Sequence, residues 1–232
     1  MILQAKTTPS PCTVLCLGDS QTLAFTNGVY PQEYWAAQLQ IQGLAAGYSL
    51  DCINCGNSGW TTTQLLAIAA DRIQRYTPQI LVFYAGVNDP GNGISSATTQ
   101  ANLQSVIDTA LANGVSYVLV VNTNYLNYSS GGDNAGAGTY YSTYVTLRTY
   151  QSAAAAYGVS TYGAAKVGYC DLFTYQKNLV LAGATGWVQG AFGSHVVDSN
   201  QHMNARGQAA TGTCVLTVLT GVSGLLEGYR IG

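Results

Sequence analysis

Three apolar, strand-like runs in the amino-terminal part of the chain each end in a polar turn that contains glycine. The first run, Val14-Leu15-Cys16-Leu17, leads directly into Gly18-Asp19-Ser20, and the turns after the next two runs are residues 54–60 and 86–89. One such turn alone indicates little, because Gly, Asn, Asp and Ser are common in any turn. In a parallel sheet, however, the carboxyl ends of the strands meet at one edge, where binding sites form. The three turns together therefore predict a polar site at that edge.

Strand-like and helical patterns alternate along the rest of the chain. Residues 80–84 form a continuous apolar run, which is typical of a central parallel strand, and residues 61–75 place apolar side chains on one helical face. The predicted strands are 13–17, 49–54, 80–84, 117–121 and 165–170. The predicted helices are 31–44, 61–75, 98–113, 140–157 and 205–219. This order predicts an α/β fold, a three-layer α/β/α sandwich with a five-stranded, mainly parallel, doubly wound sheet of the flavodoxin-like kind.

Length and charge limit the organisation and the partners. The 232 residues can form one large α/β domain and no linker-like run divides them, so we expect a single domain over residues 1–232. Charged residues make up only 8% of the chain, against about 25% in typical soluble domains, and the net charge is −2. The sequence contains neither a basic stripe for nucleic acid nor a Lys/Arg cluster for an anionic membrane. We therefore expect a neutral small molecule or glycan as substrate, and no nucleic acid.

Membrane and cysteine patterns are less informative. No apolar run approaches the roughly 18 to 20 residues of a membrane-spanning helix, and residues 1–11 lack the apolar core of a signal peptide. The compartment and the oligomeric state stay open. The six cysteines include one CxxxC and one CxxC spacing, which do not match a common zinc ribbon or finger. Disulfides and small buried thiols both remain open, and buried thiols are the favoured interpretation.

Four short motifs occur in the same order as in a known enzyme family. They are Gly18-Asp19-Ser20, Asn54-x-Gly56-x-Ser58-Gly59, Gly86-Val87-Asn88-Asp89 and His202-x-Asn204-x-x-Gly207. Through these motifs the chain resembles the SGNH hydrolases, also called GDSL-type esterases and lipases. It departs from the family pattern at Gln21, where Leu or Ile is more common, and at Met203, where proline is usual. The Gly-x-Ser-x-Gly motif of α/β-hydrolases is absent, which argues against that other serine-hydrolase fold.

The resemblance implies a serine ester hydrolase that uses no cofactor and no metal ion. Ser20 is then the nucleophile, and the oxyanion hole comprises the backbone N–H groups of Ser20 and Gly59 and the side-chain amide of Asn88. Attack by a serine hydroxyl on an ester carbonyl places negative charge on the carbonyl oxygen, so donors must already point at that position. Asp19 and Asp89 we interpret as acceptors of backbone N–H groups in their turns.

The general base must be one of two histidines, His195 and His202. His202 is preferred because it carries the Asn and Gly of the family motif, whereas His195 is interpreted as a loop residue that packs near the site. The family places an aspartate three residues before the histidine, and here that position is Ser199. Asp198, four residues before His202, is expected to complete a Ser-His-Asp triad by orienting the imidazole. The alternative is a dyad in which Ser199 or a backbone carbonyl orients His202.

The residues that decide substrate specificity are harder to identify. Aromatic side chains interleaved with polar residues in the turns and in two long loops suggest walls for sugar stacking or for a small acyl pocket. The candidates for substrate binding are Trp60, Tyr125, Trp187 and Phe192. We expect an esterase that removes short acyl groups, such as acetyl from a carbohydrate. The alternatives are a lipase or thioesterase for longer acyl chains, and a glycan-binding module without turnover.

Overall fold

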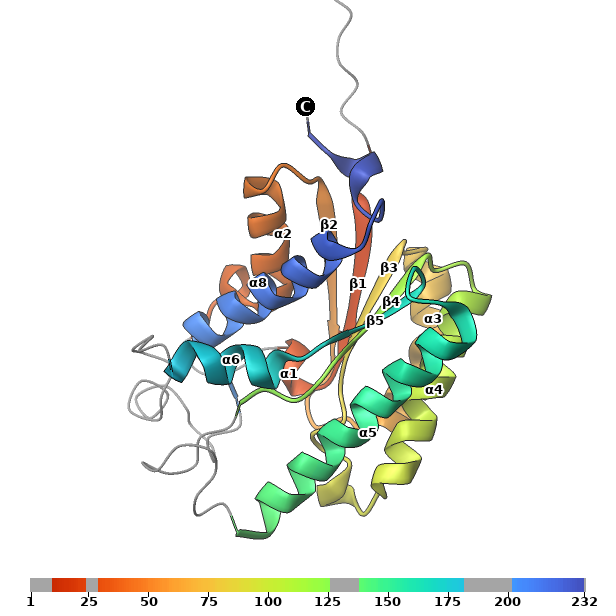
Figure 1. The fold of residues 1–232 in the computed structure, drawn as a ribbon, viewed down its shortest axis with the longest axis vertical. Helices are drawn as coiled ribbons and strands as arrows, with labels where there is room; N and C mark the ends of the chain where they lie inside the picture. Colours follow the sequence, from red (N-terminus) through yellow and green to blue (C-terminus); the bar gives the residue numbers. More distant parts are fainter. Residues whose placement is uncertain (1–9, 24–28, 126–137, 182–201, 232) are drawn as a thin grey trace, which may run out of the picture.

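A computed structural model of the chain describes residues 10–23, 29–125, 138–181 and 202–231. Five parallel strands form its central sheet, in the order β2-β1-β3-β4-β5 (Figure 1). The strands are β1 (Cys12–Gly18), β2 (Leu50–Gly56), β3 (Ile80–Tyr84), β4 (Tyr117–Val121) and β5 (Val167–Cys170). Their boundaries differ from the predicted ones by at most two residues.

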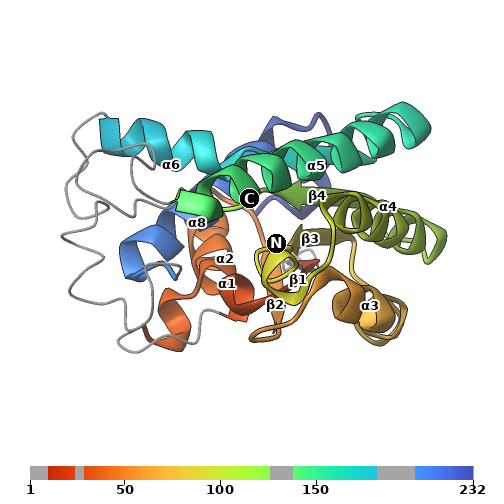
Figure 2. The same ribbon diagram turned by 90° about the horizontal axis from the view of Figure 1, so that it is seen from below.

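Helices cover both faces of the sheet, which confirms the predicted three-layer α/β/α sandwich (Figure 2). One face is covered by α2 (Trp35–Ala45), α6 (Leu172–Leu181) and α8 (Ala205–Gly221). The other is covered by α3 (Thr62–Tyr76), α4 (Ser96–Ala112) and α5 (Gly138–Tyr162). From β1 the chain builds the sheet outward in both directions, as expected of a doubly wound fold.

The side chains of β1 alternate between the two layers of the core. Val14 and Cys16 belong to the cluster shared with α2 and α8, whereas Leu15 and Leu17 belong to the cluster shared with α3 and α4. Because helices cover both faces, β3 and β4 are buried along their whole length. This burial explains why their sequences are continuous apolar runs.

Predicted helix boundaries fail where tertiary contacts decide them. The predicted helix 31–44 divides into a 3-10 turn, η1 (Pro31–Glu33), and α2, because Tyr34 between them is extended (φ −62°, ψ 143°). At the start of α2 the backbone N–H of Trp35 donates to Oε1 of Gln208 in α8, at 3.0 Å. Local sequence patterns do not reveal such a contact. Two helices have no counterpart among the predicted ones, namely α6 and a short helix, α1 (Ser20–Leu23).

The predicted end of α5 at residue 157 is also wrong, because the helix continues to Tyr162. Gly158 lies inside the helix, where a Cβ atom would be only 2.7 Å from Cγ1 of Val167 in β5. Glycine is therefore needed at this position for close packing of α5 on the sheet and does not end the helix. The chain turns instead at Gly163, whose φ of +91° lies in the left-handed region.

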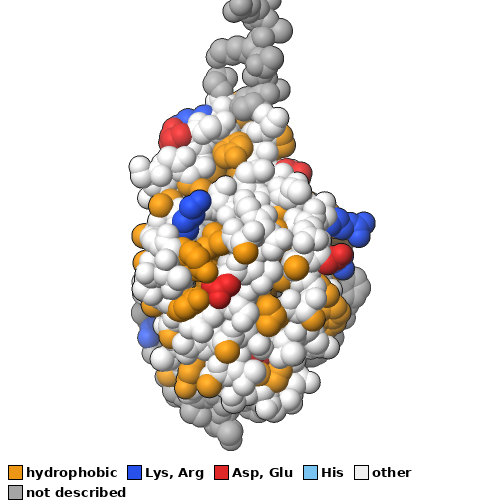
Figure 3. All heavy atoms as spheres, turned by 90° about the vertical axis from the view of Figure 1, so that its right-hand side faces the viewer, with side chains coloured by type: hydrophobic (Ala, Val, Ile, Leu, Met, Phe, Trp, Pro, Cys, Tyr) orange, Lys and Arg blue, Asp and Glu red, His pale blue; other side chains and the backbone are white. Residues whose placement is uncertain are grey.

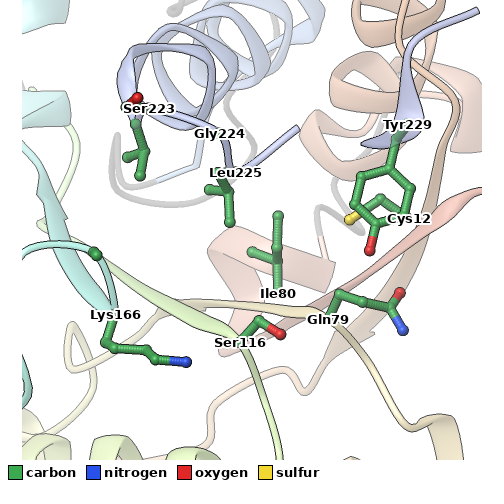
Figure 4. A pocket seen from close by; sticks show the side chains of 11 residues that line it. Cys12, Gln79, Ile80, Ser116, Lys166, Ser223, Gly224, Leu225 and Tyr229 are labelled. Atoms are coloured by element: carbon green, nitrogen blue, oxygen red, sulfur yellow. The ribbon is translucent and has the colours of Figure 1, made fainter. Parts of the chain in front are cut away.

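The carboxyl-terminal segment covers the amino ends of the strands. Its last turn, η3 (Glu227–Tyr229), is held by a hydrogen bond from the backbone N–H of Ser49 to the carbonyl of Tyr229, at 2.8 Å. A pocket of about 330 Å³ lies at this edge between η3 and the starts of β3, β4 and β5 (Figure 4). No residue of the four sequence motifs lines this pocket, so we assign it no part in the site.

The surface is poor in charge, as the composition requires. The face that includes the side of α3, α4 and α5 shows only scattered charged side chains among a mostly uncharged surface (Figure 3). Among the residues that the structure describes, no helix combines the length and the apolarity needed to cross a bilayer.

Candidate active site

The three polar turns predicted to meet do lie at one edge of the sheet. In the register of the strands, Gly18 at the end of β1 pairs with Gly56 at the end of β2 and with Tyr84 at the end of β3. The three strands therefore end at the same level, and their turns follow side by side. The backbone N–H of Asn57 donates to the carbonyl of Gly18 at 2.9 Å, which joins the first two turns directly.

The turn that carries Ser20 is packed so closely that only glycine fits beside it. A Cβ atom on Gly18 would lie 2.1 Å from the carbonyl oxygen of Tyr84, and one on Gly56 would lie 1.9 Å from the backbone nitrogen of Leu23. The chain turns at once into α1, where the backbone N–H groups of Thr22 and Leu23 donate to the carbonyl of Asp19. This tight turn places Ser20 at the amino end of α1, where it is 9% exposed.

His202 contacts Ser20 across a sequence separation of 182 residues. Its Nε2 atom lies 2.9 Å from Oγ of Ser20, within hydrogen-bonding distance. The imidazole is half-buried. The structure thus brings together the two side chains that the sequence analysis selects as nucleophile and base.

The motif around His202 is explained by how α8 begins. The side chain of Asn204 is the amino-terminal cap of α8 and accepts from the backbone N–H of Gly207 at 3.1 Å. Gly207 must be small because a Cβ atom there would meet Cβ of Met203 at 2.7 Å. Met203 itself is buried at 1% exposure, so the residue after His202 is anchored in the core. These contacts fix the position of His202, which lies three residues before the start of α8.

Asn88 and Gly59 lie in the two turns that flank Ser20. The side-chain amide of Asn88 donates to the backbone carbonyl of Trp60 at 2.9 Å, and this hydrogen bond orients the amide group. An amide nitrogen carries two hydrogens, so one donor remains for a ligand. Gly59 has a φ of +75°, and nothing lies within 4 Å of the position that a Cβ atom would take. Glycine is needed here for its backbone conformation, and its surface is open to a ligand.

Hydrogen bonds to Asp89 stabilise the third turn. Its carboxylate accepts from the backbone N–H of Thr62 at 2.8 Å, from the hydroxyl of Thr62, and from the hydroxyl of Thr99 at 2.6 Å. These donors come from the starts of α3 and α4, so Asp89 ties both helices to the turn that holds Asn88. The interpretation of Asp89 as a turn-stabilising acceptor agrees with these contacts.

Asp19 has the same structural role and is, like Asp89, fully buried. Its Oδ1 accepts from the backbone N–H of Gln21 at 2.9 Å, and its side chain is 0% exposed. Burial raises the pKa of the Asp19 carboxyl to about 7, and the backbone N–H groups of Gln21, Val87 and Gly86 oppose this increase. The negative charge of Asp89 raises the pKa further. Below pH 7 the uncharged form of Asp19 is therefore favoured in the folded protein.

The remaining predicted site residues are only partly within the described structure. Trp60 is partly buried against α3, and Tyr125 is 7% exposed, with its ring packed on Phe173 at a centroid distance of 5.3 Å. The other predicted site residues lie outside the described residues; they are Trp187, Phe192 and Asp198. The same is true of the two alternatives, His195 for the base and Ser199 for the residue that orients it.

The sequence motifs do not include one positioning residue, Gln176. Its Oε1 accepts from the backbone N–H of Tyr125 at 2.8 Å, and its Nε2 donates to Sδ of Met203 at 3.1 Å. Gln176 thus joins the segment after β4 to the residue after His202. The only signal in the sequence is that Gln176 interrupts the apolar pattern of α6, and that helix was itself not predicted.

The cysteines and the possible metal ligands can be surveyed only among the residues that the structure describes. All six cysteines are free thiols, and four of them are buried. Within the described ranges, no group of three or more His, Cys, Asp or Glu side chains is arranged to hold a metal ion.

A serine hydroxyl in contact with an imidazole at the carboxyl edge of a parallel sheet is the arrangement of a serine-dependent hydrolase. The chain belongs to the GDSL-like lipase/acylhydrolase family, whose model matches residues 16–210. This membership confirms the resemblance seen in the four motifs.

Individual relatives share the fold more clearly than the sequence. Esterase TesA of Pseudomonas aeruginosa is 32% identical over 108 residues, which are 47% of this chain and 53% of the relative. The chain thus spans about half the length of that curated relative. The crystal structure of the lipase/acylhydrolase from Enterococcus faecalis has a TM-score of 0.68 at 18% identity, covering 90% of this chain and 95% of that one. That of a catalytic mutant of Axe2, an acetylxylan esterase from Geobacillus stearothermophilus, has a TM-score of 0.65 at 16% identity, covering 96% and 98%.

The raised pKa of Asp19 predicts a pH dependence of stability. The folded pKa of about 7 lies above the unfolded value of about 3.9, so the folded state holds a proton that the unfolded state releases in this window. The contribution of Asp19 to stability is therefore complete below pH 4 and is lost as the pH rises to 7.

Asp19→Asn cannot ionise and keeps an acceptor for Gln21, so its melting temperature relative to the wild type should rise between pH 5 and pH 8. Asp71→Asn, at an exposed carboxylate on α3, is the control and should show no such trend. Parallel curves for the wild type and Asp19→Asn would contradict the prediction.

Proposed function

We propose that the protein hydrolyses carboxylic esters with Ser20 as nucleophile and His202 as general base. The observation that carries the proposal is the distance of 2.9 Å between Oγ of Ser20 and Nε2 of His202. His202 takes the proton of the hydroxyl while Oγ bonds to the ester carbonyl carbon. The protonated imidazole then returns that proton to the departing alcohol, which leaves an acyl group on Ser20. A water molecule, activated by the same imidazole, releases the acid.

The oxyanion hole in this proposal comprises the backbone N–H groups of Ser20 and Gly59 and the side-chain amide of Asn88. Three features support it. The ends of β1, β2 and β3 bring the three turns to one level, the Trp60 carbonyl orients the Asn88 amide, and Gly59 has no side chain to block approach. Each donor of this kind typically contributes about 100- to 1000-fold to turnover.

Asp198 is proposed as the third member of the triad. It lies four residues before His202, one more than in the family pattern, and the proposal places its carboxylate behind the imidazole. There it holds the imidazole in the tautomer that accepts the serine proton, and it stabilises the positive charge that follows. A dyad completed by Ser199 or a backbone carbonyl is the alternative.

The proposed substrates are neutral esters with short acyl groups, including O-acetylated carbohydrates. The low charge of the chain offers little attraction to charged substrates, and Trp60, Tyr125, Trp187 and Phe192 are the proposed contacts for the substrate. The structural neighbour named as an acetylxylan esterase acts on such an ester, which supports this class by analogy of fold.

A second candidate, hydrolysis of longer acyl chains, rests on a hollow beside α1. This hollow of about 530 Å³ is mostly apolar and is lined by Leu23, one helical turn beyond Ser20, and by residues of α2 and β2. An acyl chain directed along α1 would enter it. A third candidate is glycan binding without turnover. Binding alone does not require a contact between a serine hydroxyl and an imidazole, so the contact between Ser20 and His202 argues against this candidate.

An activity-based label separates an enzyme from a binding module. A fluorophosphonate reacts only with an activated serine, so the wild type should be labelled and Ser20→Ala should lose the label completely. Ser58→Ala, at an exposed serine of the neighbouring turn, is the matched control and should keep it. Equal labelling of wild type and Ser20→Ala would exclude Ser20 as the nucleophile.

Replacement of Asp198 distinguishes the triad from the dyad. Asp198→Asn should lower kcat by at least about 100-fold, because the amide no longer selects the productive imidazole tautomer. Ser199→Ala should change kcat by only a few-fold. The reverse ranking of the two variants, measured on p-nitrophenyl acetate, would establish the dyad instead.

A series of p-nitrophenyl esters from acetate to palmitate tests the acyl preference. We expect kcat/KM to be highest for acetate or butyrate. Ala37→Trp, which fills the hollow beside α1, should then leave the whole series unchanged. A preference for long chains that Ala37→Trp removes would establish the second candidate.

A further inference from the structure

Two buried cysteines are in contact where helix α8 packs on strand β5 of the sheet. Cys170 is the last residue of β5 and Cys214 lies inside α8, and their sulfur atoms are 3.1 Å apart. Their exposed fractions are 0% and 6%. A disulfide has an S–S distance of about 2.05 Å, so a bond requires an approach of only about 1 Å.

We propose that Cys170 and Cys214 form a disulfide that joins β5 to α8 when the chain folds in the presence of a small-molecule disulfide. The thiolate of one cysteine attacks the external disulfide and releases one small thiol. The thiolate of the other cysteine then displaces the second small thiol and forms the Sγ–Sγ bond. The protein loses two protons and two electrons, and the external disulfide gains two electrons and is reduced to two thiols.

The topology makes this pairing selective. The other four cysteines, Cys12, Cys16, Cys52 and Cys55, all lie on β1 and β2. Two strands, β3 and β4, separate β1 from β5 in the sheet. Cys12 and Cys16 belong to the same core cluster as Cys170, but β1 lies three strand spacings from β5, roughly 14 Å, so these thiols do not reach Cys170 in the folded protein. Cys214 does reach it, because α8 packs over the end of β5.

The timing of the bond follows from the burial of the pair. The hydrogen bond with Cys214 and burial both raise the pKa of the Cys170 thiol well above its usual value, so little reactive thiolate is present in the folded state. Oxidation should then be efficient while α8 is docking onto β5, when the two sulfur atoms are close but not yet fully buried, and slow in the folded protein.

The bond would stabilise the segment that carries His202. Cys170 and Cys214 are 44 residues apart, and α6 and His202 lie between them. A cross-link removes conformations from the unfolded chain, and for a loop of this length it should raise the melting temperature by roughly 10 °C. In the reduced protein only non-covalent packing holds α8 against β5.

Peptide analysis tests the pairing without any variant. The chain is refolded with oxidised and reduced glutathione or with a phosphine reductant, alkylated in denaturant and cleaved with trypsin. Cleavage after Lys166, Lys177, Arg206 and Arg230 puts Cys170 on residues 167–177 and Cys214 on residues 207–230. The oxidised sample should contain these two peptides joined and four alkylated cysteines. Six alkylated cysteines, or a different joined pair, would overturn the proposal.

Thermal unfolding provides the second measurement. The melting temperature of the wild type should be roughly 10 °C higher after oxidative refolding than after reductive refolding. The double variant Cys170→Ala/Cys214→Ala should show no such difference, and Cys55→Ala, on β2, should retain it. Equal differences in the two variants would contradict the assignment. Neither measurement depends on esterase activity, so failure of the proposed function leaves this test intact.

Discussion

The level at which β1, β2 and β3 end is the constraint on which the rest of the site depends. Gly18, Gly56 and Tyr84 pair across the three strands, so the turns that follow begin side by side. Backbone groups approach each other there more closely than any side chain would permit. Packing therefore explains Gly18 and Gly56, whereas Gly59 is explained by its positive φ and its open surroundings.

The second constraint is the docking of α8, which delivers His202 from the far end of the chain. Asn204 caps the helix, Met203 anchors its start in the core, and Gln208 bonds to the start of α2. Gln176 joins the same region to the segment after β4. A histidine held by so many contacts is preorganised, which is what a general base within reach of a serine requires. The Cys170 and Cys214 pair lies in this same interface between α8 and the sheet.

The chain has few charged residues, and the two carboxyl groups in the motif turns accept hydrogen bonds that stabilise the fold. Asp89 satisfies donors at the starts of two helices, and Asp19 lies fully buried next to Ser20. Below pH 7 the raised pKa favours the uncharged form of Asp19, and this carboxyl then places little negative charge beside Ser20. Membership in the GDSL-like lipase/acylhydrolase family establishes the class of enzyme, but a shared fold does not by itself identify the substrate.

The sequence by itself determined the strands, most helices, the sandwich and the four motifs, because apolar periodicity and glycine turns are local properties of the chain. It misplaced the start of α2 and the end of α5, and it missed α6. In each of the first two, a contact with a distant residue, Gln208 or Val167, overrides the local pattern. Only the tertiary structure decided that His202 meets Ser20 across 182 residues and that Cys170 meets Cys214. Such distances depend on how helices pack on the sheet, and no local pattern in one sequence encodes them.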